Sequence, residues 1–225
     1  MTSYRKKQVL LVGAGEFALI AHEYFTYDSD YEVVGFCVNN EYKNAETLNG
    51  LPVIDYEKIS ETAPPGSLDI FVAVPASNLN RLRKKFYLEL KQMGYSFASY
   101  QSSKAFVWRN AKVGENCFIF EANVVQPFVT IGDNCVLWSG NHIGHRSVIG
   151  NHSFLTSHVV VSGYCSVGEG CFLGVNSTLT DNISIGDYSI LGAGSVLNRD
   201  ALPESIYVGS PARVLAGRKS FDAGI

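Results

Sequence analysis

Histidines are the residues of this chain best suited to proton transfer at neutral pH. Four of the five lie in one short stretch of the C-terminal half, at His142, His145, His152 and His158. An imidazole has an ordinary pKa of about 6.5, so it can take a proton from an amine or hydroxyl as that group attacks a carbonyl carbon. The stretch predicts a general base, with a set of solvated surface histidines as the alternative interpretation.

Glycines near the start of the chain form a second candidate site. Residues 8–12 have the pattern of a buried strand and run directly into Gly13-Ala14-Gly15. A glycine turn at a helix N-terminus can hold a phosphate through backbone N–H groups. The third glycine of a G-x-G-x-x-G motif is replaced by Ala18, and Asn39-Asn40 stands where a dinucleotide enzyme has an acid for the ribose. This pattern argues against NAD.

The elements that must position the histidines follow from a six-residue repeat. Every sixth residue from Val107 to Leu197 is aliphatic, without an insertion, and a series of mostly small residues lies two positions earlier. A helix repeats every 3.6 residues and a strand every 2, so neither gives a strict six. Hexapeptide repeats are typical of a parallel β-helix, in which each repeat is a short strand and its turn. We therefore expect the aliphatic side chains to point into a prism.

The first hundred residues follow a different pattern, in which strands and helices alternate. Strands are predicted over residues 8–12, 33–38, 52–54 and 69–74, and helices over 16–27 and 78–93. Asn78 is the predicted cap of the second helix, whose apolar stripe would be Leu79, Leu82, Phe86 and Leu90. The alternation favours a small Rossmann-like βαβ domain with a parallel sheet. Residues 99–104 would be the hinge into the repeats.

The composition excludes several classes of function. The 225 residues carry a net charge of −3 and scattered basic residues, so we expect no nucleic acid and no membrane as partner. The basic start, residues 1–7, leads into a short strand and does not resemble a signal peptide, which predicts a cytoplasmic protein. The five cysteines include no C-x-x-C pair, and the four in the small series of the repeat (Cys117, Cys135, Cys165 and Cys171) are interpreted as buried free thiols.

A βαβ domain leading into hexads that end in residues 208–213, Val-Gly-Ser-Pro-Ala-Arg, resembles the hexapeptide-repeat sugar acyltransferases. The Gly144-His145 pair and residues 171–177 narrow the resemblance to sialic acid O-acetyltransferases and N-acetyltransferases of nucleotide-linked 4-amino sugars. The resemblance implies a left-handed parallel β-helix with 18 residues per coil, a homotrimer, and acetyl-CoA as acyl donor. It divides the chain into a Rossmann-like domain (1–100), the β-helix (101–200) and a C-terminal cap and tail (201–225).

The resemblance also assigns roles to the histidines. The catalytic histidine of the family matches His145, which would act as general base. On an 18-residue coil His158 lies above position 140, so we expect it near His142 and His145 at one corner, with His152 on a different face. His158 is then a candidate substrate contact.

One position departs from the family pattern. Members commonly carry an acid directly after the catalytic histidine, and this chain has Arg146 there. Either Asn141, a backbone carbonyl or an acid from the next subunit orients His145, or His142 or His158 shares its role. Arg146 would instead attract an anionic group of the substrate.

By resemblance, acetyl-CoA lies in a groove between adjacent prisms. Gly163, one coil above His145, matches a backbone N–H that faces the thioester carbonyl, and such a donor stabilises an oxyanion by roughly 3–4 kcal/mol. A tight corner with positive φ is the alternative reason for this glycine. Val175 and Ala193 match further backbone contacts, and Arg213 would meet the phosphates of CoA.

The nucleotide end is interpreted in the same way. Relatives that bind UDP-sugars use the glycine loop and the end of the second strand, which predicts Gly13, Gly15, Asn39 and Asn40 as substrate contacts. A purely structural βαβ domain is the alternative. The predicted function is acetyl-CoA-dependent N-acetylation of a nucleotide-linked amino sugar in bacterial surface-glycan biosynthesis.

Three alternatives remain open from the sequence. The first is O-acetylation of a sialic-acid-like sugar, and the second is a non-catalytic β-helix scaffold. The third is a zinc site of the kind found in β-helix carbonic anhydrases, whose ligands include an H-x4-H pair. The histidine spacings here are 3, 7 and 6, so that pair is missing and we expect no metal.

Overall fold

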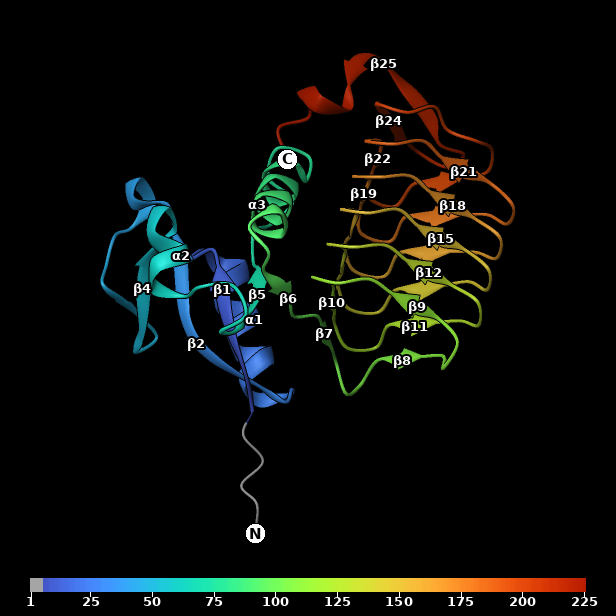
Figure 1. Cartoon of the computed structure of the whole chain (residues 1–225). Helices are drawn as coiled ribbons and strands as arrows, with labels where there is room; N and C mark the ends of the chain where they lie inside the picture. The colour runs from blue at the N-terminus through green and yellow to red at the C-terminus, as the bar shows by residue number, and fades with distance from the viewer. Residues whose placement is uncertain (1–5) are drawn as a thin grey trace.

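The computed structural model describes residues 6–225, so the predicted absence of a signal peptide rests largely on residues outside the described part. Two bodies lie side by side, an α/β domain and a triangular prism of short strands (Figure 1). Helix α3 (Arg81–Gln92) lies between them. No helix among residues 6–225 has the length and apolarity needed to cross a membrane.

The N-terminal domain is built on a six-stranded sheet in the order β3-β4-β2-β1-β5-β6, parallel except for the β3–β4 pair. Its strands are β1 (Lys7–Val12), β2 (Tyr31–Val38), β3 (Thr47–Leu48), β4 (Leu51–Asp55), β5 (Asp69–Val72) and β6 (Ser96–Phe97). Besides α3, its helical segments are α1 (Glu16–Tyr27), α2 (Ile59–Thr62), η1 (Asn40–Tyr42) and η2 (Tyr56–Lys58). The predicted strand–helix alternation and the bounds of α1 are confirmed.

The prism has three faces, each a sheet of parallel strands, and we number the faces in the order in which the chain passes through them. Face 1 holds β7 (Tyr100–Gln101), β10 (Phe118–Ile119), β13 (Val136–Leu137), β16 (Phe154–Leu155), β19 (Phe172–Leu173) and β22 (Ile190–Leu191). Face 2 holds β8 (Phe106–Val107), β11 (Val124–Val125), β14 (His142–Ile143), β17 (Val160–Val161), β20 (Thr178–Leu179) and β23 (Val196–Leu197). Face 3 holds β9 (Lys112–Val113), β12 (Thr130–Ile131), β15 (Val148–Ile149), β18 (Ser166–Val167) and β21 (Ser184–Ile185).

The hexad prediction is confirmed strand by strand. The second residue of every strand from β8 to β23 is the aliphatic of the repeat, and these residues form one core inside the prism. Strands pair with those 18 residues away, for example Val124 with His142. The four cysteines of the repeat are buried and free in this core, as predicted, and Cys37 of the N-terminal domain is also buried and free.

Each corner of the prism turns through a residue with positive φ. Corner 1/2, between faces 1 and 2, uses Ala122, Gly140, His158, Asn176 and Gly194. Corner 2/3 uses Phe128, Arg146, Tyr164 and Asn182. Corner 3/1 uses Asn116, Asn134, His152, Gly170 and Tyr188. The residues of one corner thus form a column along the prism, and only side chains at the same corner or on a face next to it can come into contact.

Face 1 packs against the N-terminal domain through a shared aromatic cluster. Phe17 and Phe25 of α1 meet Phe118 edge to face, with ring centroids 5.7 and 5.9 Å apart, and Trp138 lies beside Phe17. Such pairs add to the burial of large apolar surface. The two domains thus share one hydrophobic cluster, which is separate from the aliphatic core inside the prism.

Helix α3 differs from its prediction. It begins at Arg81 rather than Asn78, because the three residues from Asn78 to Asn80 all have positive φ and cannot form a helical turn. Its buried face matches the predicted stripe only in part: Leu79 and Leu90 are buried, but Leu82 is exposed, and Arg83 and Tyr87 are buried as well. The prism supplies polar partners for these side chains, so polar residues face inward here.

Further strand pairs are found at the two ends of the prism. Residues 99–104 are not a free hinge, because β7 already pairs with β10 in face 1. At the other end, β24 (Ser205–Val208) extends face 1 and pairs antiparallel with β25 (Arg213–Lys219). A last turn, η3 (Ser220–Asp222), brings the C-terminus beside α3, where the N–H of Leu79 donates to the carbonyl of Ile225 at 2.7 Å.

Candidate active site

His145 lies at corner 2/3, two residues after the core residue of β14, and its side chain is exposed. Its backbone N–H donates to Oε1 of Gln126 at 2.9 Å, and its Nδ1 lies 3.2 Å from the same oxygen. The ring of Tyr164 meets the imidazole edge to face at 5.1 Å. The imidazole is therefore held in one orientation on the outside of the prism.

Gly163 lies directly next to this imidazole, in the following coil. A Cβ atom at Gly163 would come within 2.6 Å of Cε1 and 3.0 Å of Nε2 of His145. The φ angle of Gly163 is not in the positive range, so the interpretation as a tight corner is wrong. Glycine is needed here because its missing side chain leaves room for the ring.

The backbone N–H of Gly163 already has a partner within the chain. It donates to Oδ1 of Asp181 at 3.0 Å. The same arrangement recurs at corner 3/1, where the backbone N–H of Glu169 donates to Oδ1 of Asp187, one coil further on. The Gly163 amide, which was predicted to face a thioester carbonyl, is thus already hydrogen-bonded to the next coil of the same chain.

The predicted convergence of three histidines is wrong. His158 lies over Gly140 at corner 1/2, whereas His145 lies at corner 2/3, one full face away. His142 lies between them on β14 and is partly buried. His152 is on another corner, as predicted. Positions 140 and 145 are close in sequence but lie at the two ends of β14. Because this strand spans the whole of face 2, a side chain above position 140 is not near His145.

Arg146 does not orient His145, and no acid does so among the described residues. Its guanidinium lies over the ring of Phe128, 4.5 Å from the centroid. The orienting group is Gln126, which the sequence analysis did not identify. It lies 19 residues before His145, so the 18-residue register of the coil is the signal that points to it.

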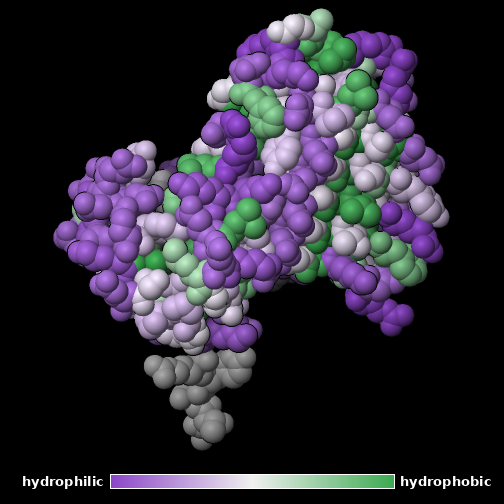
Figure 2. Space-filling view, turned by 45° about the horizontal axis from the view of Figure 1, so that its top comes forward, coloured by the Kyte–Doolittle hydropathy of each residue, from purple (hydrophilic) through white to green (hydrophobic). Residues whose placement is uncertain are grey.

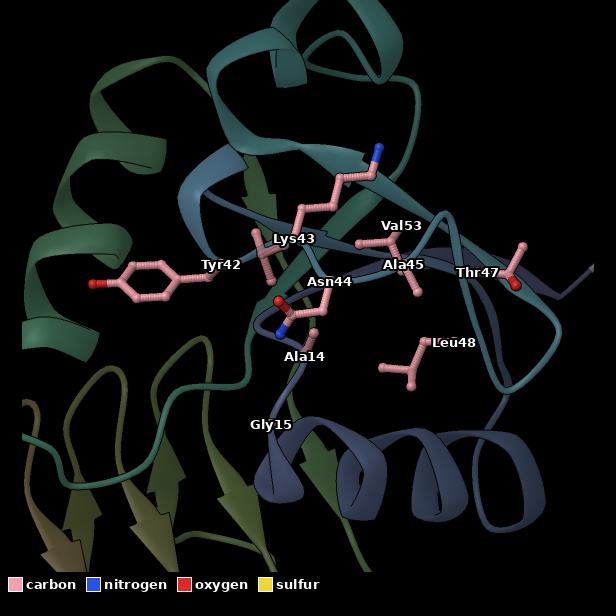
Figure 3. Close-up of a pocket in the computed structure, with 10 residues that line it drawn as sticks. Ala14, Gly15, Tyr42, Lys43, Asn44, Ala45, Thr47, Leu48 and Val53 are labelled. Carbon is pink, nitrogen blue, oxygen red and sulfur yellow. The ribbon is translucent and has the colours of Figure 1, made fainter.

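Two cavities adjoin the glycine loop of the N-terminal domain. One of about 430 Å³ lies above the entry to α1; Tyr42, Asn44 and Leu48 surround it, with Ala14 and Gly15 below (Figure 3). A second cavity of about 420 Å³ shares Ala14 and Tyr42. Both open at the carboxyl ends of β1 and β2, where open α/β sheets commonly bind ligands.

The predicted nucleotide contacts are only partly brought together. Gly13 lines the second cavity, and its φ of +129° and the nearby carbonyl of Ala73 exclude a side chain there. Asn39 lines the same cavity, and its Nδ2 donates to Oε1 of Glu57 at 3.0 Å. Asn40 lines neither cavity; its backbone N–H donates to Glu57 at 3.1 Å. That hydrogen bonding lowers the pKa of Glu57.

A third cavity, of about 310 Å³, lies between the two domains. Its lining runs from Gly13 and Gly15 past Phe17 and Pro75 to Trp138 of the prism. Trp138 directly follows β13, next to corner 1/2. The space beside the glycine loop thus continues to this corner and not to corner 2/3, where His145 lies.

The predicted acetyl-CoA contacts fall at two separate edges of face 2. Gly163 is at corner 2/3, whereas Val175 and Ala193 are exposed at corner 1/2. Arg213 begins β25 and is exposed at the end of the prism. Within residues 6–225 no three His, Cys, Asp or Glu side chains gather in a way that would hold a metal ion.

Comparison with known proteins agrees with this architecture. The family model described as bacterial transferase hexapeptide (six repeats) matches residues 110–145, 129–163 and 164–199. A search of curated protein sequences found no match. Most of the chain, however, superimposes on solved structures.

Three of these structures show how far the likeness extends. The acetyltransferase domain of PglB from Neisseria gonorrhoeae FA1090 is 20% identical, with a TM-score of 0.83, covering 93% of this chain and 100% of that one. PerB from Caulobacter crescentus, in complex with CoA and GDP-perosamine, is 25% identical with a TM-score of 0.81, covering 92% and 96%. WeeI from Acinetobacter baumannii AYE is 19% identical, with a TM-score of 0.62, covering 93% and 100%.

These matches cover both domains and confirm the predicted order of a Rossmann-like domain and a left-handed β-helix. The histidine at the prism corner and the cavities at the glycine loop lie on this shared frame. The chain therefore carries bacterial transferase hexapeptide repeats over residues 110–199, and its two-domain fold is similar to that of these solved acetyltransferases.

Proposed function

We propose that the protein transfers the acetyl group of acetyl-CoA to the amine of a nucleotide-linked amino sugar. The observation that carries this proposal is the His145 imidazole, held against the side-chain-free position of Gly163 with its Nδ1 on Gln126. PerB, 25% identical, was solved with CoA and GDP-perosamine, and the PglB domain with acetyl coenzyme A. Both ligands of PerB are of the classes proposed here.

The chemistry requires one base and no covalent intermediate on the protein. The lone pair of the neutral amine attacks the thioester carbonyl carbon, and a C–N bond forms as the amine proton passes to Nε2 of His145. The carbonyl then re-forms as the C–S bond breaks, and the CoA thiolate takes the proton from the His145 imidazolium, which restores the base. A sugar hydroxyl would react in the same way, so the base alone does not distinguish N- from O-acetylation.

We infer that each active site lies between two subunits of a homotrimer. The cavity beside the glycine loop opens toward corner 1/2, and His145 lies at corner 2/3 of the same chain, across face 2. A substrate held at that cavity would meet the His145 of a neighbouring copy whose face 2 packs against this one. The same packing would bring Gly163 of one copy close to Val175 and Ala193 of the next.

The outward side chains of the prism support this packing. Face 1 is covered by the N-terminal domain. The outward residues of face 3 are mostly polar: Lys112, Thr130, Val148, Ser166 and Ser184. Those of face 2 are mostly apolar: Phe106, Val124, His142, Val160, Thr178 and Val196. Hydrophobic atoms are visible along the prism in Figure 2, and Phe106, Phe128 and Tyr164 are each 53% exposed in the single chain. Exposed apolar patches of this kind mark protein interfaces.

The remaining predicted contacts have places in this arrangement. Gly13, Gly15 and Asn39 would hold the nucleotide, because the start of α1 and the glycine loop present backbone N–H groups to its phosphates. Arg213 would meet the phosphates of CoA. His158 and Arg146, at the two edges of face 2, are proposed as contacts to the substrate. We place the reaction in the cytoplasm, as the sequence predicted.

The direct test is the mass of the product after incubation with acetyl-CoA and a panel of UDP-, dTDP- and GDP-linked amino sugars. One added acetyl group on any member supports acetyl transfer and identifies the nucleotide, and an acetyl group that resists hydroxylamine, which cleaves esters, supports N-acetylation. Product on a sialic-acid-like sugar instead would support O-acetylation. Absence of both products, together with absence of CoA binding by calorimetry, would contradict the proposal and favour a scaffold.

A further inference from the structure

The hydrogen bonds at Gln126 define which nitrogen of His145 carries a proton. A backbone N–H can only donate, so the Gln126 atom 2.9 Å from the His145 amide must be the side-chain oxygen. Turning the amide over would place two donors face to face. The same oxygen lies 3.2 Å from Nδ1 of His145 and can only accept. In the neutral ring Nδ1 must therefore bear the hydrogen, and Nε2 the lone pair.

The position of Gln126 follows from the missing side chain of Gly163. At the matching places of other coils, a backbone N–H donates to an Asp or Asn of the next coil, as Glu115 does to Asp133. Gly163 offers no such side chain to the amide of His145. Gln126, in the preceding coil and partly buried, accepts that hydrogen bond instead and reaches the ring at the same time.

We propose that Gln126 is the positioning residue of His145, fixing the Nδ1–H tautomer so that Nε2 is the atom that accepts the substrate proton. It takes the place of the carboxylate that commonly fixes a catalytic histidine, but carries no charge. The other polar groups near the ring cannot do this. Tyr164 meets it edge on, Arg146 is stacked on Phe128, and Asp181 is bonded to the Gly163 amide.

The proposal rests on the proposed acetyl transfer for its catalytic consequence, but not for its structural test. Nitrogen NMR of ¹⁵N-histidine protein reports the tautomer without any substrate, and the His145 signals are those lost in His145→Gln. We expect a protonated Nδ1 and a bare Nε2 in the neutral wild-type ring. Gln126→Ala should move His145 toward the Nε2–H form or a mixture. A wild-type Nε2–H ring, or an unchanged tautomer in Gln126→Ala, would overturn the proposal.

Kinetics then test the consequence. Gln126→Ala should lower kcat roughly tenfold to a hundredfold with little change in the KM for acetyl-CoA, because the base and not the binding is affected. Gln126→Glu should restore most of kcat and move the acidic limb of the pH–rate profile up by about one unit, since a carboxylate stabilises the imidazolium.

A control variant separates positioning from a general effect on the prism. Gln101→Ala removes an exposed glutamine of β7, far from corner 2/3, and should match the wild type in kcat and tautomer. An equal loss of kcat in Gln101→Ala and Gln126→Ala would contradict a positioning role. So would a Gln126→Glu variant with the pH profile of the wild type. If no substrate is turned over, the NMR result still decides the role of Gln126 in orienting the ring.

Discussion

The stability of the protein should depend on pH through one buried histidine at the domain interface. His152 is 4% exposed at corner 3/1, and its Nδ1 accepts a hydrogen bond from Nδ2 of Asn134 at 2.9 Å. A protonated ring could not accept that bond. Burial in these surroundings lowers the pKa of His152 from 6.5 to about 4. Lys84 and Arg83 act in the same direction, and Glu169 and Asp133 oppose it.

The sign and size of the effect follow from that shift. Between pH 6.5 and 4 the unfolded chain binds a proton that the folded chain refuses, so stability falls as the pH falls through this window. The contribution of the neutral His152 to stability is fully present above about pH 6.5. With these two pKa values, lowering the pH from 7 to 5 should reduce the free energy of unfolding by about 2 kcal/mol through His152 alone.

The substitution that tests this is His152→Asn. Asn116 and Asn134 occupy the same column with φ of 52° and 56°, so asparagine accepts this backbone conformation. The variant should lose about 2 kcal/mol of the pH dependence between pH 7 and 5. The matched control is His158→Asn, at an exposed corner residue with φ of 60°.

Urea unfolding, followed by tryptophan fluorescence at fixed protein concentration and ionic strength, gives the free energy at each pH. We expect the wild type and His158→Asn to share the same loss of stability at pH 5. A His152→Asn variant with the pH dependence of the wild type would refute the reasoning.

Three further predictions concern other parts of the molecule. Gly163→Ala should reduce kcat at least about tenfold in steady-state kinetics, because its Cβ would displace the His145 ring; unchanged kcat would show that the ring position does not matter. Arg83→Ala should lower the free energy of unfolding by about 3 kcal/mol in urea titration, because Arg83 is buried and bonds three backbone carbonyls of the prism. Lys85→Ala, on the exposed side of the same helix, is its control, and equal losses would contradict the argument. Arg213→Gln should weaken CoA binding several-fold in calorimetry but leave dephospho-CoA unaffected, if the guanidinium meets the 3′-phosphate; an equal effect on both ligands would exclude that contact.

The fold was predictable where the sequence pattern allowed a residue type only one environment. An aliphatic at every sixth position can only be buried inside a three-faced prism, and all sixteen strands from β8 to β23 follow it. The buried face of α3 was only partly predictable from its apolar residues, because Arg83 and Tyr87 face a prism corner that offers Asn134 and the acids Glu115 and Asp133 as partners. Patterns within one segment cannot show what the opposite surface supplies.

The candidate site was predictable in part for a similar reason. His145 could be proposed from its place in a hexad, and Gly163 from the coil above it. The 18-residue register also placed His158 above position 140, but proximity to His145 further depends on which corner each position occupies. Gln126 was missed because glutamine next to a strand is an ordinary surface residue until its contact in the next coil is known.

The central claim is that acetyl transfer occurs between subunits, with the nucleotide sugar on one copy and His145 on the next. Two inactive variants test it directly: His145→Asn removes the base, and Ala14→Phe fills the cavities at the glycine loop. Co-expressed one to one and purified as mixed oligomers, they should regain about a quarter of wild-type activity, the fraction of interfaces with both parts intact. Mixed oligomers without activity would place each site within one chain and contradict the account.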